Sequence, residues 1–411
     1  MTTPNPAYQT TPQGELGRGT NQVAVRAYNE RLVLSLIREH QRLPKAEIAR
    51  ATGLSAQTIS VIVKQLEADG LLRKEAPRRG KVGQPSVPFS LDPEGALSFG
   101  LKIGRRSSEI ILMDFLGRVR HSATQTYPFP RRDAVLNFAQ AGVHDLLAEI
   151  GPDQAARVCG LGIAVPSEFW QWESDVEAPA GALDEWRNID LRETVKAACG
   201  LPTHVCNDAT AACAAELTFG NPAHSLDYLY IFIGYFVGGG IVLDRALFPG
   251  RTGNAGALGS MPVAPVAGQP GQLHQLIHEA SLIGLEKRLT ASGRDPQAIW
   301  DAGLDWSAFD ELVDDWIEQA APALAESVVA ACAVIDFQAA VIDGAMPAAV
   351  RSRLVERVRQ EVHRFDRRGL SPVDFREGTI GAGARAIGGA TLPILASFAR
   401  DRDVLFRNAA A

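Results

Sequence analysis

Cysteine is scarce in this chain, and long apolar runs are absent. The five cysteines are Cys159, Cys199, Cys206, Cys213 and Cys332. An odd number of scattered thiols argues against a disulfide framework, so we expect them to be small, buried apolar residues. No apolar run is long and uninterrupted enough to cross a bilayer, and the sequence therefore predicts no membrane association.

The first 20 residues lack the apolar segment of a secretory signal peptide. They are polar and rich in proline and glycine, a composition that cannot bury enough apolar surface to fold. We therefore expect residues 1–20 to be a disordered tail and the protein to stay in the cytoplasm.

The composition is otherwise that of an ordinary globular protein. Of the 411 residues, 46% are hydrophobic and 21% are charged, and a chain of this length forms more than one domain. Residues 1–90 contain 13 lysines and arginines against 7 aspartates and glutamates, whereas the rest contains 28 against 40. A basic segment attracts phosphates and an acidic one is repelled by them. Any contact with nucleic acid is therefore expected near the front of the chain.

Three helices are predicted in this front segment. The first covers residues 25–39, where apolar residues recur at helical spacing. The second is short and follows Pro44, and Gly53 supplies the turn before the third. Ser55 is a good N-cap for the third helix. The core face of that helix is expected to consist of Ile59, Ile62, Val63 and Leu66.

The opposite face of the third helix carries mostly short polar groups and also includes Val61. In a helix-turn-helix this face enters the major groove, where its first residues meet base edges. Gln57 is the candidate for an adenine contact and Lys64 for a phosphate contact. The alternative is a small helical bundle that contacts other proteins. The candidate DNA contacts are Lys45, Ser55, Ala56, Gln57, Thr58, Ser60 and Lys64.

A basic segment with glycine and proline over residues 73–85 follows the third helix, in the position of a wing. A charged loop by itself is most often a solvated surface. Its place beside a recognition helix favours contact with the DNA backbone instead. The candidate residues here are Arg78, Arg79, Lys81 and Gln84.

From residue 97 onward the pattern changes to alternating strands and helices, which predicts an α/β fold. Strands are expected over residues 97–103, 109–114, 119–126 and 158–165, with a second strand-rich part over 228–248. Helices are expected over residues 134–150, 273–289, 320–337, 348–365 and 381–398.

Four motifs of the body, together with the N-terminal block, resemble the ROK family, which groups sugar-responsive bacterial repressors with sugar kinases. These motifs lie at Gly160–Pro166, Val205–Glu216, Gly238–Val242 and Gly253–Gly259. The resemblance extends from about residue 21 to the C-terminus. It implies a winged helix-turn-helix followed by two actin-like (ribonuclease H-like) α/β lobes. Family kinases lack the N-terminal block, so its presence favours the repressor branch.

The resemblance also implies the domain boundaries. The winged helix-turn-helix is expected over residues 21–90. The first lobe is expected over residues 91–206 together with about 380–411. The second lobe, with oligomerisation helices, is expected over residues 207–379.

The kinase chemistry that the resemblance implies is not matched by the residues present. Phosphoryl transfer needs a phosphate cradle of small residues and backbone amides. The Asp-x-Gly-Gly-Thr loop of the family kinases is replaced by Lys102–Arg106, and the Gly-Thr-Gly of their second phosphate loop by Gly234–Phe236. We therefore predict no catalytic residues, no enzyme activity and no cofactor.

The structural zinc site that the resemblance implies is also unmatched. Its histidine is replaced by Ser260, and residues 265–277 contain no cysteine. His274 and His278 are spaced i, i+4 and could share a metal, but no third ligand is in view. Histidines that pack or lie on the surface are the favoured interpretation, and we predict no metal.

The sugar pocket implied by the resemblance is only partly retained. Asn207 and Asp208 are present, whereas the other three sugar-binding positions hold Ala257, Ser260 and Ile277. The alternative for the retained pair is that Asp208 caps the following helix and Asn207 supports a turn. The candidate effector-binding residues are Asn188, Asn207, Asp208 and Asn254.

These observations predict a DNA-binding transcriptional regulator, a repressor of a carbohydrate-related operon. Its expected partners are a double-stranded DNA operator and a sugar or sugar-derivative effector, and it is expected to act as a homodimer or homotetramer. Two alternatives stay open: an ATP-dependent sugar kinase, and a DNA-binding regulator without a small-molecule effector.

Overall fold

The computed structural model describes seven stretches of the chain, and its contacts divide them into two compact units. The described residues are 22–77, 86–171, 173, 178–220, 225–264, 274–301 and 303–400. We call one of the two units the N-terminal unit. It holds the described residues up to Ile163, those of Glu168–Val205 and those from Gly389 onward. The second, the C-terminal unit, holds the described residues of Ala164–Ser167 and Cys206–Gly388.

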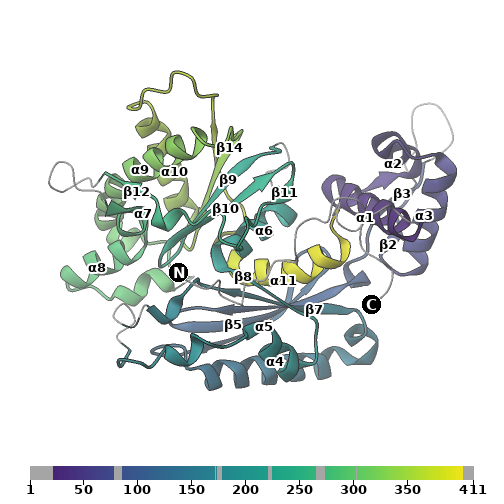
Figure 1. Ribbon diagram of the computed structural model, residues 1–411, viewed down its shortest axis with the longest axis horizontal. Coiled ribbons are helices and arrows are strands. Elements are labelled where there is room, and N and C mark those ends of the chain that lie inside the picture. The colour runs from purple at the N-terminus through teal and green to yellow at the C-terminus, as the bar shows by residue number, and fades with distance from the viewer. Residues whose placement is uncertain are drawn as a thin grey trace. The chain divides into compact units, whose positions relative to one another are not determined.

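The N-terminal unit begins with a winged helix-turn-helix (purple in Figure 1). Its helices are α1 (Gln22–His40), α2 (Lys45–Thr52) and α3 (Ala56–Ala68). A small antiparallel sheet of order β1-β3-β2 joins β1 (Leu43–Pro44), β2 (Leu72–Lys74) and β3 (Pro88–Leu91). Gly53 ends α2 with a φ of 71°, a left-handed conformation that glycine adopts without strain. The predicted core face of α3 is confirmed: Ile59, Ile62, Val63 and Leu66 are all buried.

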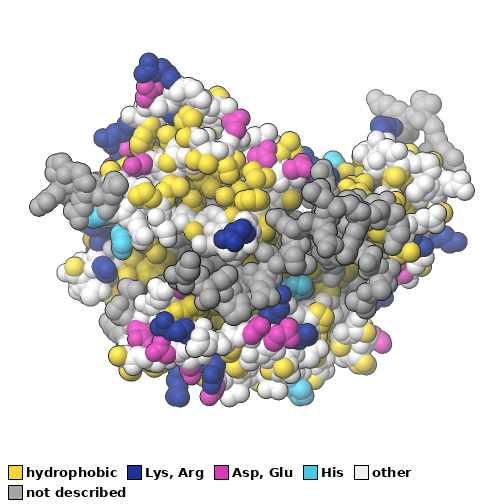
Figure 2. Space-filling model, viewed as in Figure 1, with side chains coloured by type: hydrophobic (Ala, Val, Ile, Leu, Met, Phe, Trp, Pro, Cys, Tyr) yellow, Lys and Arg dark blue, Asp and Glu magenta, His cyan; other side chains and the backbone are white. Residues whose placement is uncertain are grey.

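A five-stranded sheet of order β6-β5-β4-β7-β8 follows. Its strands are β4 (Leu97–Ile103), β5 (Ser107–Asp114), β6 (Val119–Thr126), β7 (Val158–Val165) and β8 (Thr203–Asn207). The first three, all of them predicted strands, pair antiparallel. The helices of this region are α4 (Arg132–Ala155) and α5 (Leu191–Cys199). Charges of both signs are interspersed over α4 at the bottom of Figure 2, as on a solvated helix face.

The winged helix-turn-helix is anchored to the rest of the N-terminal unit through Arg38 of α1. Its Nη1 donates to the carbonyl oxygen of Phe115, 2.7 Å away, and its guanidinium lies 4.6 Å from the Phe115 ring centroid. Burial lowers the pKa of Arg38 to about 10, partly offset by the charge of Asp114. Phe115 also packs edge-on against Phe398, at a centroid distance of 4.9 Å. The first helix of the DNA-binding part is thus bonded to the turn after β5.

The C-terminal unit is built on a sheet of order β11-β10-β9-β14-β15. Its strands are β9 (Tyr228–Ile233), β10 (Val237–Leu243), β11 (Ala246–Leu247), β14 (Ala339–Gly344) and β15 (Asp374–Glu377). β14 runs parallel to β9 and β15, which is the mixed pairing of an α/β lobe. A separate pair joins β12 (Pro262–Val263) and β13 (His274–Gln275).

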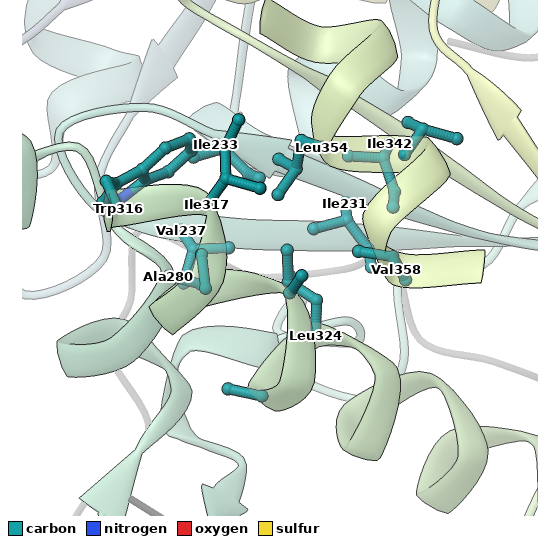
Figure 3. Packing of buried hydrophobic residues seen from close by; sticks show 14 of the residues in the cluster. Ile231, Ile233, Val237, Ala280, Trp316, Ile317, Leu324, Ile342, Leu354 and Val358 are labelled. Carbon is teal, nitrogen blue, oxygen red and sulfur yellow. The ribbon is translucent and has the colours of Figure 1, made fainter. Parts of the chain in front are cut away.

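Side chains of β9 alternate between two cores because successive residues of a strand point to opposite faces. Leu229, Ile231 and Ile233 pack in the large core with α9 and α10. Figure 3 shows Ile231 and Ile233 among Trp316, Leu324 and Leu354. The alternate residues Tyr228, Tyr230 and Phe232 pack against Ala209, Ala212 and Cys213 of α6. Helices therefore cover both faces of this sheet.

The helices of this unit are α6 (Asp208–Phe219), α7 (Leu276–Ala280), α8 (Ile283–Ala291), α9 (Asp310–Cys332) and α10 (Ala348–Val362). The last helix, α11 (Ala384–Phe398), begins in this unit and continues in the N-terminal unit. The described residues also form short 3-10 helices between these elements: η2 (Pro93–Gly95), η3 (Phe169–Gln171), η4 (Asp184–Trp186), η5 (Leu258–Ser260), η6 (Pro296–Trp300), η7 (Ser307–Phe309) and η8 (Gly381–Gly383). No helix among the described residues is long and apolar enough to cross a membrane.

Two predicted helices were wrong in extent. The helix predicted over residues 273–289 is interrupted at Ser281, where α7 ends in an extended conformation. Ser281 is held there because its Oγ accepts from Val237 N and its carbonyl oxygen accepts from the Trp316 indole. The helix predicted over residues 320–337 instead spans Asp310–Cys332, so that it starts ten residues earlier. The strands β8, β14 and β15 were not predicted.

The cysteine prediction was right for Cys213 and wrong for the others. Cys213 is buried, and the other four are only partly buried. All five thiols are free. Burial raises the pKa of Cys159 to about 12, which keeps this thiol protonated at neutral pH.

Candidate DNA interface and effector site

The N-terminus of α3 is fixed by a side-chain cap. Ser55 Oγ accepts from Thr58 N at 3.1 Å and lies 2.8 Å from Thr58 Oγ1, which confirms Ser55 as the N-cap. Both hydroxyls are therefore engaged with each other, and the side chains free to reach a base edge lie elsewhere on the helix. This local pattern positions Gln57 within the first turn.

The face of α3 opposite its core is exposed. Its exposed side chains include Ala56, Gln57, Ser60, Val61 and Lys64. At about 100° per residue, Gln57, Val61 and Lys64 fall in one stripe on the side of the helix away from Ile59 and Leu66. We call Gln57, Val61 and Lys64 the reading stripe. It combines an amide, an apolar group and a cation within two turns.

The remaining predicted DNA contacts are distributed around α3. Lys45 is half-buried at the start of α2, with its Nζ 5.4 Å from the Phe89 ring centroid. β2 and β3 pair antiparallel, with Arg73 opposite Ser90, so they form the two strands of a wing. Arg78, Arg79, Lys81 and Gln84 connect these strands and lie outside the described residues.

Asn207 and Asp208 stand where β8 ends and α6 begins. Asn207 Oδ1 accepts from Ala209 N at 3.0 Å and from Thr210 N at 3.3 Å. Asn207 Nδ2 donates to Ser167 Oγ at 3.2 Å. The alternative in which Asp208 caps the helix is therefore wrong in its assignment. Asn207 is the N-cap, and Asp208 is the first helical residue. The short Asn side chain reaches back over the helix start, as caps do.

Asp208 carries a partner that the sequence did not reveal. Its Oδ2 lies 3.4 Å from Nη1 of Arg385 on α11, and the two side chains are 18% and 14% exposed. The Arg385 guanidinium lies 5.3 Å from the ring centroid of Phe232. The charge of Asp208 is thus balanced within the C-terminal unit. The only sequence signal was a lone charge within the small and apolar residues 381–390.

The four predicted effector residues are divided between the two units. Asn254 lies exposed in the C-terminal unit with Asn207 and Asp208. Asn188 is exposed and belongs to the N-terminal unit. Only the Asn207–Asp208 pair is held by the hydrogen bonds described above, together with Ser167 and Arg385.

Aromatic side chains contact or stand in both turns that correspond to the implied phosphate loops. In the β4–β5 turn, Gly104 O accepts from the Tyr127 hydroxyl at 2.7 Å, and burial raises the pKa of Tyr127 well above its usual value. In the β9–β10 turn, the rings of Tyr235 and Phe236 pack at a centroid distance of 4.8 Å. Tyr235 also lies 6.0 Å from Trp300. Bulky side chains therefore stand where a phosphate cradle requires small residues.

The two histidines of β13 and α7 do not form a metal centre with a third ligand. His274 Nδ1 lies 2.8 Å from Glu279 Oε1, and the His274 and His278 rings are 6.4 Å apart. Among the described residues there is no group of three or more side chains able to hold a metal ion. Glu279 is buried and also accepts from Gln319 Nε2 at 3.0 Å. His274 is thus part of a hydrogen-bonded packing network.

Comparison with known proteins agrees with this geometry. The chain is 27% identical to an uncharacterized protein of Sinorhizobium fredii, y4fQ, over 90% of this chain and 91% of that one. It is 25% identical to the xylose repressor of Caldicellulosiruptor bescii, over 73% and 75%. It is 22% identical to the DNA-binding transcriptional dual regulator NagC of Escherichia coli, over 60% of each.

Solved structures share the fold. A ROK family transcriptional regulator, a homolog of the E. coli MLC protein, superposes with a TM-score of 0.64 at 21% identity, covering 93% of this chain and 98% of that one. A ROK family glucokinase from Streptomyces griseus, bound to glucose and AMPPNP, gives 0.55 at 21% identity, covering 72% and 99%. Residues 26–73 match the winged helix-turn-helix DNA-binding family, and residues 98–394 match the ROK family. The chain therefore belongs to the ROK family and carries a winged helix-turn-helix at its front.

Proposed function

We propose that this protein is a transcriptional repressor of a carbohydrate-related operon, which binds operator DNA through α3 and senses a sugar or sugar derivative through its ROK body. The observation that carries the proposal is the exposed reading stripe on the capped third helix of a winged helix-turn-helix. The xylose repressor and NagC, which this chain resembles over most of their lengths, support it. We further propose a homodimer or homotetramer that binds a palindromic or repeated operator.

The body is proposed to bind its effector without phosphorylating it. Asn207 and Asp208 are the central contacts, and Asn188 and Asn254 are further candidates. The Arg385 partner of Asp208 and the aromatic rings at Tyr235 and Phe236 support a binding role without ATP. An effector can shift operator binding only by its difference in affinity for the two states of the protein.

Incubation with ATP, Mg²⁺ and a panel of sugars, sugar phosphates and sugar acids tests this role. We expect at least one compound to raise the melting temperature while no ADP is released, because the small residues of the phosphate loops are replaced. Sugar-dependent ADP release that Asp208→Asn abolishes would instead establish a kinase. A panel in which nothing raises the melting temperature favours a DNA-binding regulator without an effector.

Gln57→Ala is expected to weaken binding to the operator by about 1–3 kcal/mol while binding to unrelated DNA stays nearly unchanged, because an amide that pairs with an adenine edge acts only at the right base. Fluorescence anisotropy with operator and scrambled duplexes measures the affinity for each kind of DNA. Equal losses on both duplexes would rule out base reading by Gln57.

Lys64→Ala is the matched control on the same stripe. A phosphate contact adds affinity for any DNA sequence. This change should therefore weaken binding to the operator and to the scrambled duplex alike. It should also reduce the slope of log affinity against log salt by about 1.

A further inference from the structure

Val61 is an apolar side chain on the exposed face of α3. It is 59% exposed. Two residues before it Ile59 is buried, and directly after it Ile62 is buried, so the helix core is complete on the other side. Position 61 faces away from that core because each residue advances the helix by about 100°.

Helix stability does not account for a valine at this position. A β-branched residue is a poorer helix former than alanine by a few tenths of a kcal/mol, about 0.5 at most. The other large exposed apolar residues of the winged helix-turn-helix, Val23 and Val25, lie in the first turn of α1. Among the described residues, Val61 is the one large apolar side chain exposed on α3.

The neighbours of Val61 define the surface that it belongs to. Gln57 lies one turn before it and Lys64 one turn after it, on the same stripe. Lys64 is exposed. A cationic, amide-bearing face with one apolar group in its middle is complementary to the major groove of DNA. That groove presents one apolar group, the C5-methyl of thymine.

We infer that Val61 contacts the C5-methyl group of a thymine in the operator. This inference rests on the proposed function and adds a specificity-determining residue to it. Four residues of helix span about 6 Å, and successive base pairs are about 3.4 Å apart. The thymine therefore lies one or two base pairs from the base pair that Gln57 contacts.

Deleting the methyl from the DNA tests the contact directly. The full-length protein first selects its site from a library of random duplexes. Each thymine of the selected site is then replaced singly by uracil, which differs only in lacking that methyl. At one position per half-site the wild-type protein is expected to lose about fourfold in affinity, the equivalent of the ~0.8 kcal/mol for burying one methyl group. Val61→Ala is expected to bind the thymine and uracil duplexes equally.

The comparison of two proteins on two duplexes isolates the contact, because any change in DNA shape affects both proteins. Val23→Ala is the matched control, because it removes the same atoms from an exposed valine outside the stripe. This variant should still bind the thymine duplex about fourfold more tightly than the uracil duplex. Failure to select any sequence would overturn the proposed function and this inference with it. A selected site with no uracil-sensitive thymine, or one whose sensitivity Val61→Ala retains, would overturn the inference alone.

Discussion

Asp343→Ala is expected to lower the free energy of unfolding by about 3–5 kcal/mol, the cost of removing one partner of a buried ion pair. Asp343 is fully buried and accepts from Arg351 Nη1 at 3.1 Å, and from the backbone amides of Gly344 and Gly381 at 2.9 Å. The Tyr230 hydroxyl also donates to it at 3.1 Å, and burial raises the pKa of Tyr230 well above its usual value, so the donor stays protonated. The substitution removes this acceptor from all four donors, and of these Arg351 keeps an ion pair with Glu377 at 3.5 Å.

Urea denaturation followed by circular dichroism measures this loss. The control is Glu356→Ala, which breaks the exposed pair with Arg359 on α10, the helix that also carries Arg351. An exposed pair of this spacing is worth about 0.5 kcal/mol or less. Comparable losses in the two variants would show that Asp343 is not the tie between the end of β14 and the residues before α11.

Gly388→Ala is expected to be at least as damaging, with a loss of about 3 kcal/mol or more. A Cβ at this position would overlap the carbonyl oxygen and carbon of Ala211 in α6. Backbone atoms cannot rotate out of the way as a side chain can, so the two helices must separate. The separation would also draw Arg385 away from Asp208, because they sit on these same helices.

Gly284→Ala is the control for this change. A Cβ at Gly284 would meet only Trp316, at an ordinary contact distance of 3.6 Å. Alanine is the better helix former, so this variant should be as stable as the wild type or more stable by up to about 1 kcal/mol. Thermal denaturation compares the stability of the two variants with that of the wild type. A Gly388→Ala protein as stable as Gly284→Ala would contradict the close approach of α11 and α6.

Both predictions concern the packing of α11 and of the residues just before it. This helix makes contacts at both of its ends. Its first turn carries Arg385, the partner of Asp208 in the candidate effector site. Its last residue, Phe398, packs on Phe115, which in turn binds Arg38 of α1. The two ends of α11 thus carry the partner of Asp208 and a ring that packs on the anchor of α1.

The sequence by itself determined the DNA-binding part. The spacing of Ile59, Ile62, Val63 and Leu66, the cap at Ser55 and the turn at Gly53 are short-range patterns, and the structure contains all of them. Such signals act over a few residues, so they can be recognised without the rest of the fold.

Only the tertiary structure decided how the candidate effector site is held. Arg385 meets Asp208 across 177 positions of the chain, and Thr379 and Ile380 donate to Glu216 of α6 across more than 160. The break between α7 and α8 likewise depends on bonds from Val237 and Trp316 to Ser281. No local pattern encodes these partners, because they become neighbours only when the sheet and its helices close around them. The helix of the reading stripe is thus set by neighbouring residues, and the polar contacts of the candidate effector site are set by the fold.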